Sequence, residues 1–188
     1  MQRNGKNQTN PSINIESKPI PINIINKVIK SICKIIIKKE DKRIYGTGFF
    51  LNIPDSGKYL CTNNHVISKE TINEDIYLEI HNNKRRKLKI NNRNIKYFEK
   101  PKDITIIEIK NDDRFYKYIE FLNYDINNKN GYEIYNNADI FSIGYPLGKG
   151  PVYANGKIIG IDNNEFFFFQ YQLIMAHQGA QLYYYMMI

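Results

Sequence analysis

Short runs of β-branched and aromatic residues follow one another along most of this chain, and turn-forming residues separate them. An apolar run at 28–37 precedes a second run at 45–53, and the Pro-Asp-Ser-Gly segment at 54–57 predicts a tight turn. Further strand-like runs lie at 58–62, 76–80, 88–90, 104–109, 138–143, 152–161 (with Gly156 at an expected turn or bulge) and 166–169. The sequence has no internal repeat and no long amphipathic helical pattern. Short, regularly spaced strands of this kind are typical of an all-β sandwich or barrel.

The strand-like runs fall into two groups along the chain. Residues 1–24 are rich in Asn, Ser and Pro, which predicts a disordered leader. Residues 25–112 hold the first group, the polar stretch 113–136 connects the groups, and residues 137–188 hold the second. A chain of 188 residues suffices for one domain or for two small lobes packed together. We therefore expect two β lobes in tandem behind a leader.

The net charge of +8 raises the question of a nucleic-acid or membrane partner. The excess is spread along a chain rich in Asn, Ile, Lys and Tyr, a mixture that AT-rich codons produce, so we expect no nucleic-acid partner. A basic nucleic-acid-binding β domain is the competing interpretation. It predicts a salt-dependent affinity that falls when Arg85 and Arg86 become Ala.

The start of the chain and the cysteines favour an intracellular location. The first ten residues are polar and lack the apolar segment of a signal peptide. The apolar run 20–37 contains three Lys residues, so we expect no membrane span. Cys33 and Cys61 lie far apart without CxxC spacing, which predicts two free thiols and no metal site.

Two segments carry residues suited to acid–base chemistry. His65 ends the run Thr62-Asn63-Asn64-His65, where an imidazole can be fixed by a core strand and still reach a cleft, although a histidine there also suits a simple strand end. Asp103 opens the apolar run 104–109, and a carboxylate at the edge of a hydrophobic strand needs a partner. Orienting an imidazole is one such partnership, and forming a turn after Pro101 is the other interpretation.

In order and spacing, four segments resemble the trypsin-like serine peptidase domain of the chymotrypsin superfamily (PA clan), in particular its HtrA/DegP-like branch. The segments are Gly46-Thr47-Gly48-Phe49, Thr62-Asn63-Asn64-His65-Val66, Asp103-Ile104-Thr105-Ile106-Ile107 and Ile143-Gly144-Tyr145-Pro146-Leu147-Gly148. The resemblance covers residues 28 to about 170 and implies two six-stranded β-barrels with a cleft between them. It also implies that His65 is the general base and that Asp103 is the carboxylate that orients it.

The nucleophile that the resemblance requires is missing from the sequence. The family places a serine in a Gly-rich loop of the type G-x-S-G-[GS]-P, but residues 176–181 read Ala-His-Gln-Gly-Ala-Gln. Gln178, which stands near the expected position, forms no acyl intermediate. Ser142 lies upstream in a predicted strand, and neither cysteine stands where a nucleophile is needed. We therefore expect no peptidase activity from the chain as written, and an incomplete second barrel.

The tail at 170–188 has no charged residue and ends in Tyr-Tyr-Tyr-Met-Met-Ile, unlike the rest of the chain. Back-translation in a shifted frame, from the third base of the Phe169 codon, forces Gly at the Met175/Ala176 junction and allows Ser at the His177/Gln178 junction. The allowed codons permit Thr-Asp-x-Gly-x-Ser-Gly-Ser-Pro without a break. Our hypothesis is that a frameshift or a mis-joined gene has replaced the nucleophile loop, so that the tail is truncated or altered.

The resemblance thus implies a serine-type endopeptidase that acts on polypeptide substrates without a cofactor or a metal ion. The alternative is a pseudoprotease that binds a protein or peptide in the same cleft without cutting it. Substrate preference and oligomeric state are not indicated by the sequence.

Overall fold

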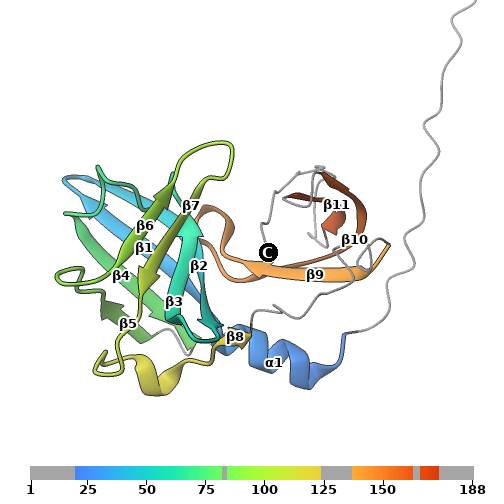
Figure 1. Ribbon diagram of the computed structural model, residues 1–188, viewed down its shortest axis with the longest axis horizontal. Coiled ribbons are helices and arrows are strands. Elements are labelled where there is room, and N and C mark those ends of the chain that lie inside the picture. The colour runs from blue at the N-terminus through green and yellow to red at the C-terminus, as the bar shows by residue number, and fades with distance from the viewer. Residues whose placement is uncertain (1–19, 82–83, 124–136, 163–165, 174–188) are drawn as a thin grey trace, which may run out of the picture.

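The structure, a computed structural model, describes residues 20–81, 84–123, 137–162 and 166–173. These residues form one α-helix, α1 (Ile22–Lys30), and two β-sheets that lie side by side in Figure 1. The first sheet contains β1 (Ile32–Lys39), β2 (Lys42–Ile53), β3 (Gly57–Asn63), β4 (Asp75–Ile80), β5 (Lys84–Lys87), β6 (Ile95–Phe98), β7 (Ile104–Glu108) and β8 (Leu122–Asn123). The second contains β9 (Asp139–Gly144), β10 (Val152–Asp162) and β11 (Phe166–Leu173). Two short 3₁₀ turns are η2 (Tyr116–Tyr118) and η4 (Pro146–Gly148).

The first sheet has eight strands in the order β5-β4-β1-β2-β3-β7-β6, and β8 pairs with β2. All neighbours in this order are antiparallel, whereas β8 runs parallel to β2. Within the described residues no ladder joins β5 to β6, so the sheet is curved but not closed into a barrel. The second sheet has the order β11-β10-β9. The predicted all-β architecture is confirmed, with open sheets in place of closed barrels.

The hydrophobic core lies on one face of the first sheet, to which β1 contributes the alternate residues Cys33, Ile35 and Ile37. Its fully buried members include Ile35, Phe50, Leu60 and Ile107, each contributed by a different strand. The run from Ile35 to Ile37 is buried at every residue because β1 is central and both of its faces are covered. Strand β1 also contacts β9 of the second sheet and η4, the 3₁₀ turn that follows β9. This contact, together with that of η4 with β2, places the end of β9 and the turn after it against the centre of the first sheet.

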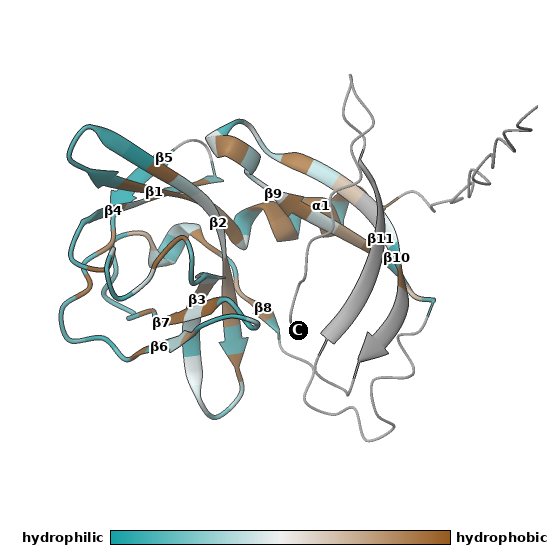
Figure 2. Ribbon diagram, turned by 90° about the horizontal axis from the view of Figure 1, so that it is seen from above, coloured by the Kyte–Doolittle hydropathy of each residue, from teal (hydrophilic) through white to brown (hydrophobic). Residues whose placement is uncertain are grey.

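Helix α1 differs from the sequence-based expectation. It contains the last residues of the predicted leader and the first residues of the predicted strand at 28–37. Ile25, Val28 and Ile29 recur at helical spacing and are partly buried, and α1 packs against β1. Figure 2 shows hydrophobic segments on this helix in brown. Lys27 and Lys30 occupy the last turn, where cations interact favourably with the helix dipole.

Three smaller differences concern strand positions. The predicted strand at 88–90 lies outside the sheet, and the basic segment before it forms the edge strand β5. Strands β6 and β8 were not predicted, since they have only four and two residues, and β8 lies within the stretch 113–136 that we expected to be a connection. The irregularity expected at Gly156 occurs instead between Ile158 and Gly160, where the register of β10 against β11 shifts. Residues 1–19 of the predicted leader lie outside the described residues.

The two cysteines are buried and not bonded to each other. Cys33 lies opposite Gly48, and Cys61 lies opposite the next residue of β2, Phe49, so the two thiols point to opposite faces of the sheet. In the described ranges there is no helix long and apolar enough to span a membrane. The same ranges contain no cluster of three or more His, Cys, Asp or Glu side chains suited to a metal ion.

Candidate active site

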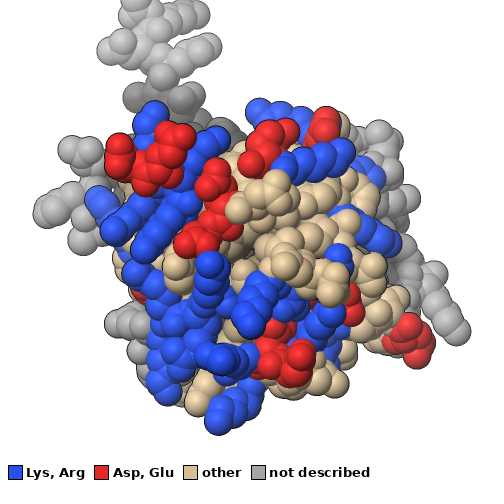
Figure 3. All heavy atoms as spheres, turned by 90° about the vertical axis from the view of Figure 1, so that its left-hand side faces the viewer, with Lys and Arg blue, Asp and Glu red and all other residues tan. Residues whose placement is uncertain are grey.

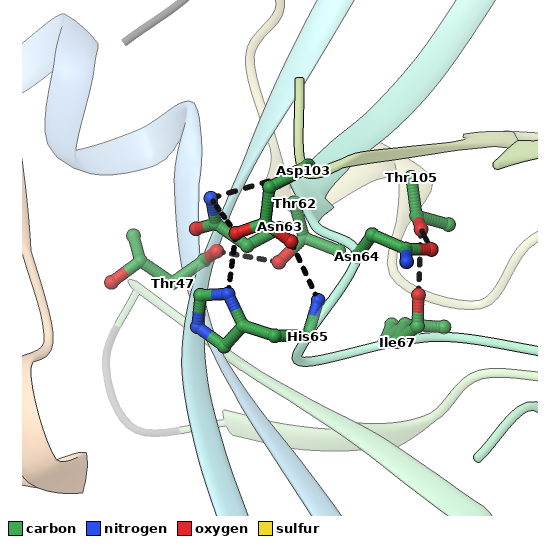
Figure 4. A network of polar contacts seen from close by, with 8 residues as sticks. All are labelled: Thr47, Thr62, Asn63, Asn64, His65, Ile67, Asp103 and Thr105. Carbon is green, nitrogen blue, oxygen red and sulfur yellow. Dashed lines mark hydrogen bonds and ion pairs between the residues drawn. The ribbon is translucent and has the colours of Figure 1, made fainter. Parts of the chain in front are cut away.

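His65 and Asp103 meet at one end of the first sheet, where β3 ends and β7 begins (Figure 4). Asp103 Oδ2 lies 2.6 Å from His65 Nδ1. The other carboxylate oxygen, Oδ1, accepts the backbone N–H of His65 at 2.9 Å. One carboxylate therefore fixes both the ring and the backbone of the histidine.

The conformation and hydrogen bonds of the turn that carries Asp103 orient this carboxylate toward His65. Asp103 has a backbone φ of 52°, a left-handed conformation that Asp tolerates better than most residues. Its carbonyl oxygen accepts the backbone N–H of Asn64 at 3.0 Å and the side-chain amide of Asn63 at 3.3 Å. The Asn63 amide also lies 3.4 Å from Asp103 Oδ2. The asparagines of the Thr-Asn-Asn-His segment thus bind the turn that supplies the carboxylate.

Thr105 anchors the loop that follows His65 to strand β7. Its buried hydroxyl lies 3.1 Å from Asn64 Oδ1 and 2.6 Å from the carbonyl oxygen of Ile67. A single hydroxyl proton serves one of these acceptors at a time, and the shorter contact favours the Ile67 carbonyl. The backbone on both sides of His65 is therefore held by the strand that Asp103 opens.

Close packing beneath the histidine explains a glycine of the first motif. A Cβ atom at Gly46 would lie 2.5 Å from Cγ1 of Val66, which is closer than any real contact of this kind. Val66 is buried and directly follows His65. The absence of a side chain at position 46 lets β2 support the loop that carries the imidazole.

Thr47 connects the second sheet to the same strand end. Its hydroxyl oxygen accepts the backbone N–H of Tyr145 at 2.8 Å, just after β9. Its carbonyl oxygen accepts the hydroxyl of Thr62 at 2.8 Å, and Thr62 is the buried start of the Thr-Asn-Asn-His segment. One residue of β2 is thus bonded to both sheets beside His65.

The side chains of His65 and Asp103 differ in exposure. The His65 ring is 64% exposed, whereas the Asp103 side chain is 21% exposed. A carboxylate acceptor at Nδ1 favours the tautomer with the proton on that nitrogen, which leaves Nε2 as the proton acceptor of the neutral ring. The arrangement suits a base that takes a proton from a group in solution or on a bound molecule.

The other residues that the sequence analysis considered lie apart from this pair. Ser142 lies within β9 opposite Ala154, and no hydrogen bond among the described residues joins it to His65. Cys33 and Cys61 are buried, and burial raises the pKa of both thiols, that of Cys61 to about 12. Gln178 lies outside the described residues.

The residues that hydrogen-bond around His65 and Asp103 stand in the sequence motifs, but the sequence alone assigned them no role. Thr47, Asn63, Asn64 and Thr105 all stand inside the motifs that carry the family resemblance. Their position beside His65 or Asp103 in those motifs was the available signal, but which atoms they bond follows only from the fold.

Comparison with solved structures supports the fold, whereas comparison with protein sequences finds no relative. No protein-family model and no curated protein sequence matches the chain. A serine endoprotease from Yersinia pestis has a similar structure, with a TM-score of 0.55 and 15% identity over 84% of this chain and 55% of that chain. An inactive mutant of Rv3671c from M. tuberculosis H37Rv gives a TM-score of 0.53 and 18% identity over 86% of this chain and 77% of that chain. This chain thus spans little more than half of the Yersinia protein.

The strand order, the position of His65 and Asp103 and the two structural neighbours lead to one conclusion. The chain has the all-β fold of the trypsin-like serine peptidases.

Proposed function

We propose that His65 and Asp103 are the general base and the orienting carboxylate of a serine-type endopeptidase site. The observation that carries the proposal is the double contact of one carboxylate, 2.6 Å to Nδ1 and 2.9 Å to the backbone N–H of the same histidine. A simple surface ion pair would need only the contact with the ring, and not the second contact with the backbone N–H. The fold shared with a serine endoprotease supports the same proposal.

In this mechanism the imidazole takes the proton of a serine hydroxyl through Nε2 while the serine oxygen attacks the carbonyl carbon of a polypeptide. Asp103 accepts the Nδ1 proton in a hydrogen bond and stabilises the imidazolium ion that forms. The imidazolium then gives its proton to the leaving amine, and the same ring activates the water that hydrolyses the acyl-enzyme. The reaction uses no cofactor and no metal ion.

The chain as written lacks the serine nucleophile of this mechanism. Position 178 carries Gln where the family has its serine loop, so we propose that the 188-residue chain has the base and not the nucleophile. Removal of the nucleophile from a serine peptidase lowers kcat by a factor on the order of a million. We propose that the shifted frame after Phe169 encodes the serine loop that the written tail replaces.

The coding DNA across codons 165–188 is the first test of the tail, and the second is a pair of expressed chains. One chain carries the written tail, and the other carries the tail of the shifted frame. We expect a fluorophosphonate, which labels activated serines, to react only with the second chain. His65→Ala in that chain removes the label, whereas His81→Ala, at an exposed histidine after β4, keeps it. Labelling that survives His65→Ala overturns the assignment of the base.

The binding-module alternative predicts a different result. A pseudoprotease with an intact coding sequence would bind unstructured peptides without cutting them, and a transcript that matches the written tail would favour it. Measuring peptide affinity and hydrolysis on the same chain separates the two functions. Affinity without hydrolysis in the frame-restored chain contradicts the endopeptidase proposal.

A further inference from the structure

A basic hollow lies at the β5 edge of the first sheet, beside η2. Its volume is about 520 Å³, within the range of about 300–1,000 Å³ that small-molecule sites occupy. It is lined by Arg86, Asn111, Asp113, Arg114, Tyr116, Lys117 and Tyr118. Figure 3 shows the face of the molecule that is on the left in Figure 1, and Lys and Arg side chains cover much of its lower part. Three of the lining residues, Arg86, Arg114 and Lys117, are cations, so the hollow itself is basic.

The pleat of β5 divides its four basic residues into two pairs. Arg85 and Lys87 share a face with Glu79 and Tyr77 of β4, and Arg85 binds Glu79 at 3.0 Å. Lys87 likewise pairs with Asp75. Both β5 cations on this face are therefore paired with carboxylates of β4, and Glu79 also binds Lys34 of β1.

The other pair of β5 faces the hollow side. Lys84 and Arg86 lie opposite the buried Ile80 and Leu78 in the ladder. The guanidinium of Arg86 donates to the carbonyl oxygen of Arg85 at 3.1 Å, which is a neutral acceptor. Among the described residues, neither cation forms an ion pair with a carboxylate. This face of β5 thus presents positive charge that the sheet leaves uncompensated.

The one carboxylate in the lining is already used. Asp113 accepts two hydrogen bonds from the guanidinium of Arg93, one of them at 2.9 Å, and the backbone N–H of Lys110 at 2.8 Å. The side chains of Arg93 and Asp113 are 4% and 10% exposed, so this ion pair is buried. Its charges cancel, and it leaves Arg86, Arg114 and Lys117 as the net charge of the hollow.

The positive charge around the hollow acts on Tyr118. Lys84 Nζ lies 4.6 Å from the centre of its ring and Lys117 Nζ lies 5.1 Å from it. Lys117, through a hydrogen bond and its charge, lowers the pKa of the Tyr118 hydroxyl, and the charges of Lys84 and Arg86 lower it further. Three cations from two separate segments therefore act on one phenol, and the hollow favours negative charge.

We propose that this hollow binds a small anion that carries two phosphoryl groups. Guanidinium groups match phosphate oxygens in pairs, and Arg86 and Arg114 come from different segments that line the same space. Four cations, counting Lys84 over the ring of the lining residue Tyr118, suit a diphosphate better than a single carboxylate. The site is independent of the His65–Asp103 pair and does not rest on the proposed peptidase function.

The test is calorimetric titration of the 188-residue chain with inorganic pyrophosphate at fixed ionic strength. We expect Arg86→Gln and Arg114→Gln each to weaken binding by at least about tenfold, since each removes a charged hydrogen-bond donor. Arg85→Gln is the matched control, because it removes the same charge one residue away on the face where Arg85 is paired with Glu79, and we expect a change below twofold. Circular dichroism checks that each variant is folded, and Lys117→Gln replaces any variant that is not.

Three results overturn the proposal. The first is no heat of binding at millimolar pyrophosphate. The second is an equal loss of affinity from Arg85→Gln and Arg86→Gln, which indicates a general attraction of anions to a basic surface. The third is a single-stranded oligonucleotide that binds tightly while pyrophosphate does not compete with it, which favours a nucleic-acid site.

Discussion

Asp103 holds His65 at two points, with Oδ2 2.6 Å from the ring nitrogen Nδ1 and Oδ1 2.9 Å from the backbone nitrogen. Orientation of the ring is therefore coupled to the conformation of the loop between β3 and β4. The asparagines before the histidine bind the same turn in return, through the carbonyl oxygen of Asp103. A change at the carboxylate is thus expected to affect the imidazole and the loop together.

Asp103→Asn tests this coupling with little change in shape, because Asn also tolerates the left-handed backbone that Asp103 adopts, with φ of 52°. We expect the neutral His65 ring to lose its preference for a proton on Nδ1, which the ¹⁵N shifts of the labelled imidazole report. The loss of a charged acceptor lowers the free energy of unfolding by about 1.5–3 kcal/mol. Asp41→Asn, in the exposed turn after β1, is the control. Unchanged ring shifts in Asp103→Asn contradict the prediction.

Thr47→Val removes the hydroxyl that accepts the Tyr145 backbone N–H at 2.8 Å and retains the shape of the side chain. We expect the free energy of unfolding in urea to fall by about 1 kcal/mol, the usual net contribution of one hydrogen bond. Thr47→Ser keeps the acceptor and is expected to lose less. If Val and Ser at this position are equally stable, the bond between the sheets contributes nothing measurable.

The pairing of His65 with Asp103 was predictable because each residue stands in a short motif at the end of a strand. Local sequence also predicted most strands, since the alternation of apolar and polar residues follows the pleat. Helix α1 was missed because its Ile and Val residues are equally typical of strands, and the helical period shows only in the partial burial of Ile25, Val28 and Ile29.

Contacts between distant segments were beyond reach of the sequence. Thr47 and Tyr145 are 98 positions apart, and nothing in either motif indicates that a hydroxyl of one meets an amide of the other. The division of β5 into one face paired with β4 carboxylates and one face without a carboxylate partner is similar, because it depends on the register of β5 against β4. From the sequence alone, the four basic residues of β5 form a single basic segment, and only the register divides them between two faces.

Gly46→Ala tests the packing under the histidine. The added Cβ would lie 2.5 Å from Val66 Cγ1, so Val66 must move and the loop with it. We expect a loss of about 1–3 kcal/mol in the free energy of unfolding, the usual cost of overpacking a core. Gly150→Ala is the matched control, since no atom lies within 4 Å of a Cβ built there. Equal effects of the two substitutions contradict the explanation.

Asp113→Asn leaves the guanidinium of Arg93 buried without its countercharge, since the Arg93 side chain is only 4% exposed. Breaking a buried pair from one side costs about 3–5 kcal/mol, so we expect a large drop in the urea midpoint. Asp112→Asn changes the neighbouring exposed carboxylate and is expected to have little effect. A mild effect of Asp113→Asn would mean that water reaches Arg93.

The buried thiols predict a loss of stability at alkaline pH. Burial raises the pKa of both cysteines above the ordinary value of 9.0, that of Cys61 to about 12. The folded chain therefore keeps both protons above pH 9 while the unfolded chain releases them. This contribution is complete below pH 9 and is lost as the pH rises from 9 toward 12. Each thiol adds up to about 1.4 kcal/mol per pH unit to the decline.

The double variant Cys33→Ala, Cys61→Ala isolates this effect from the lysines and tyrosines, which titrate in both chains. We expect the free energy of unfolding of the parent chain to fall more steeply than that of the variant between pH 9 and pH 10, by about 1 kcal/mol for each thiol. A thiol reagent at pH 8 gives an independent measurement. Because both side chains are buried, we expect reaction only after urea unfolds the chain. Parallel pH curves for the two chains, or rapid reaction of the folded protein, would show that water reaches the thiols.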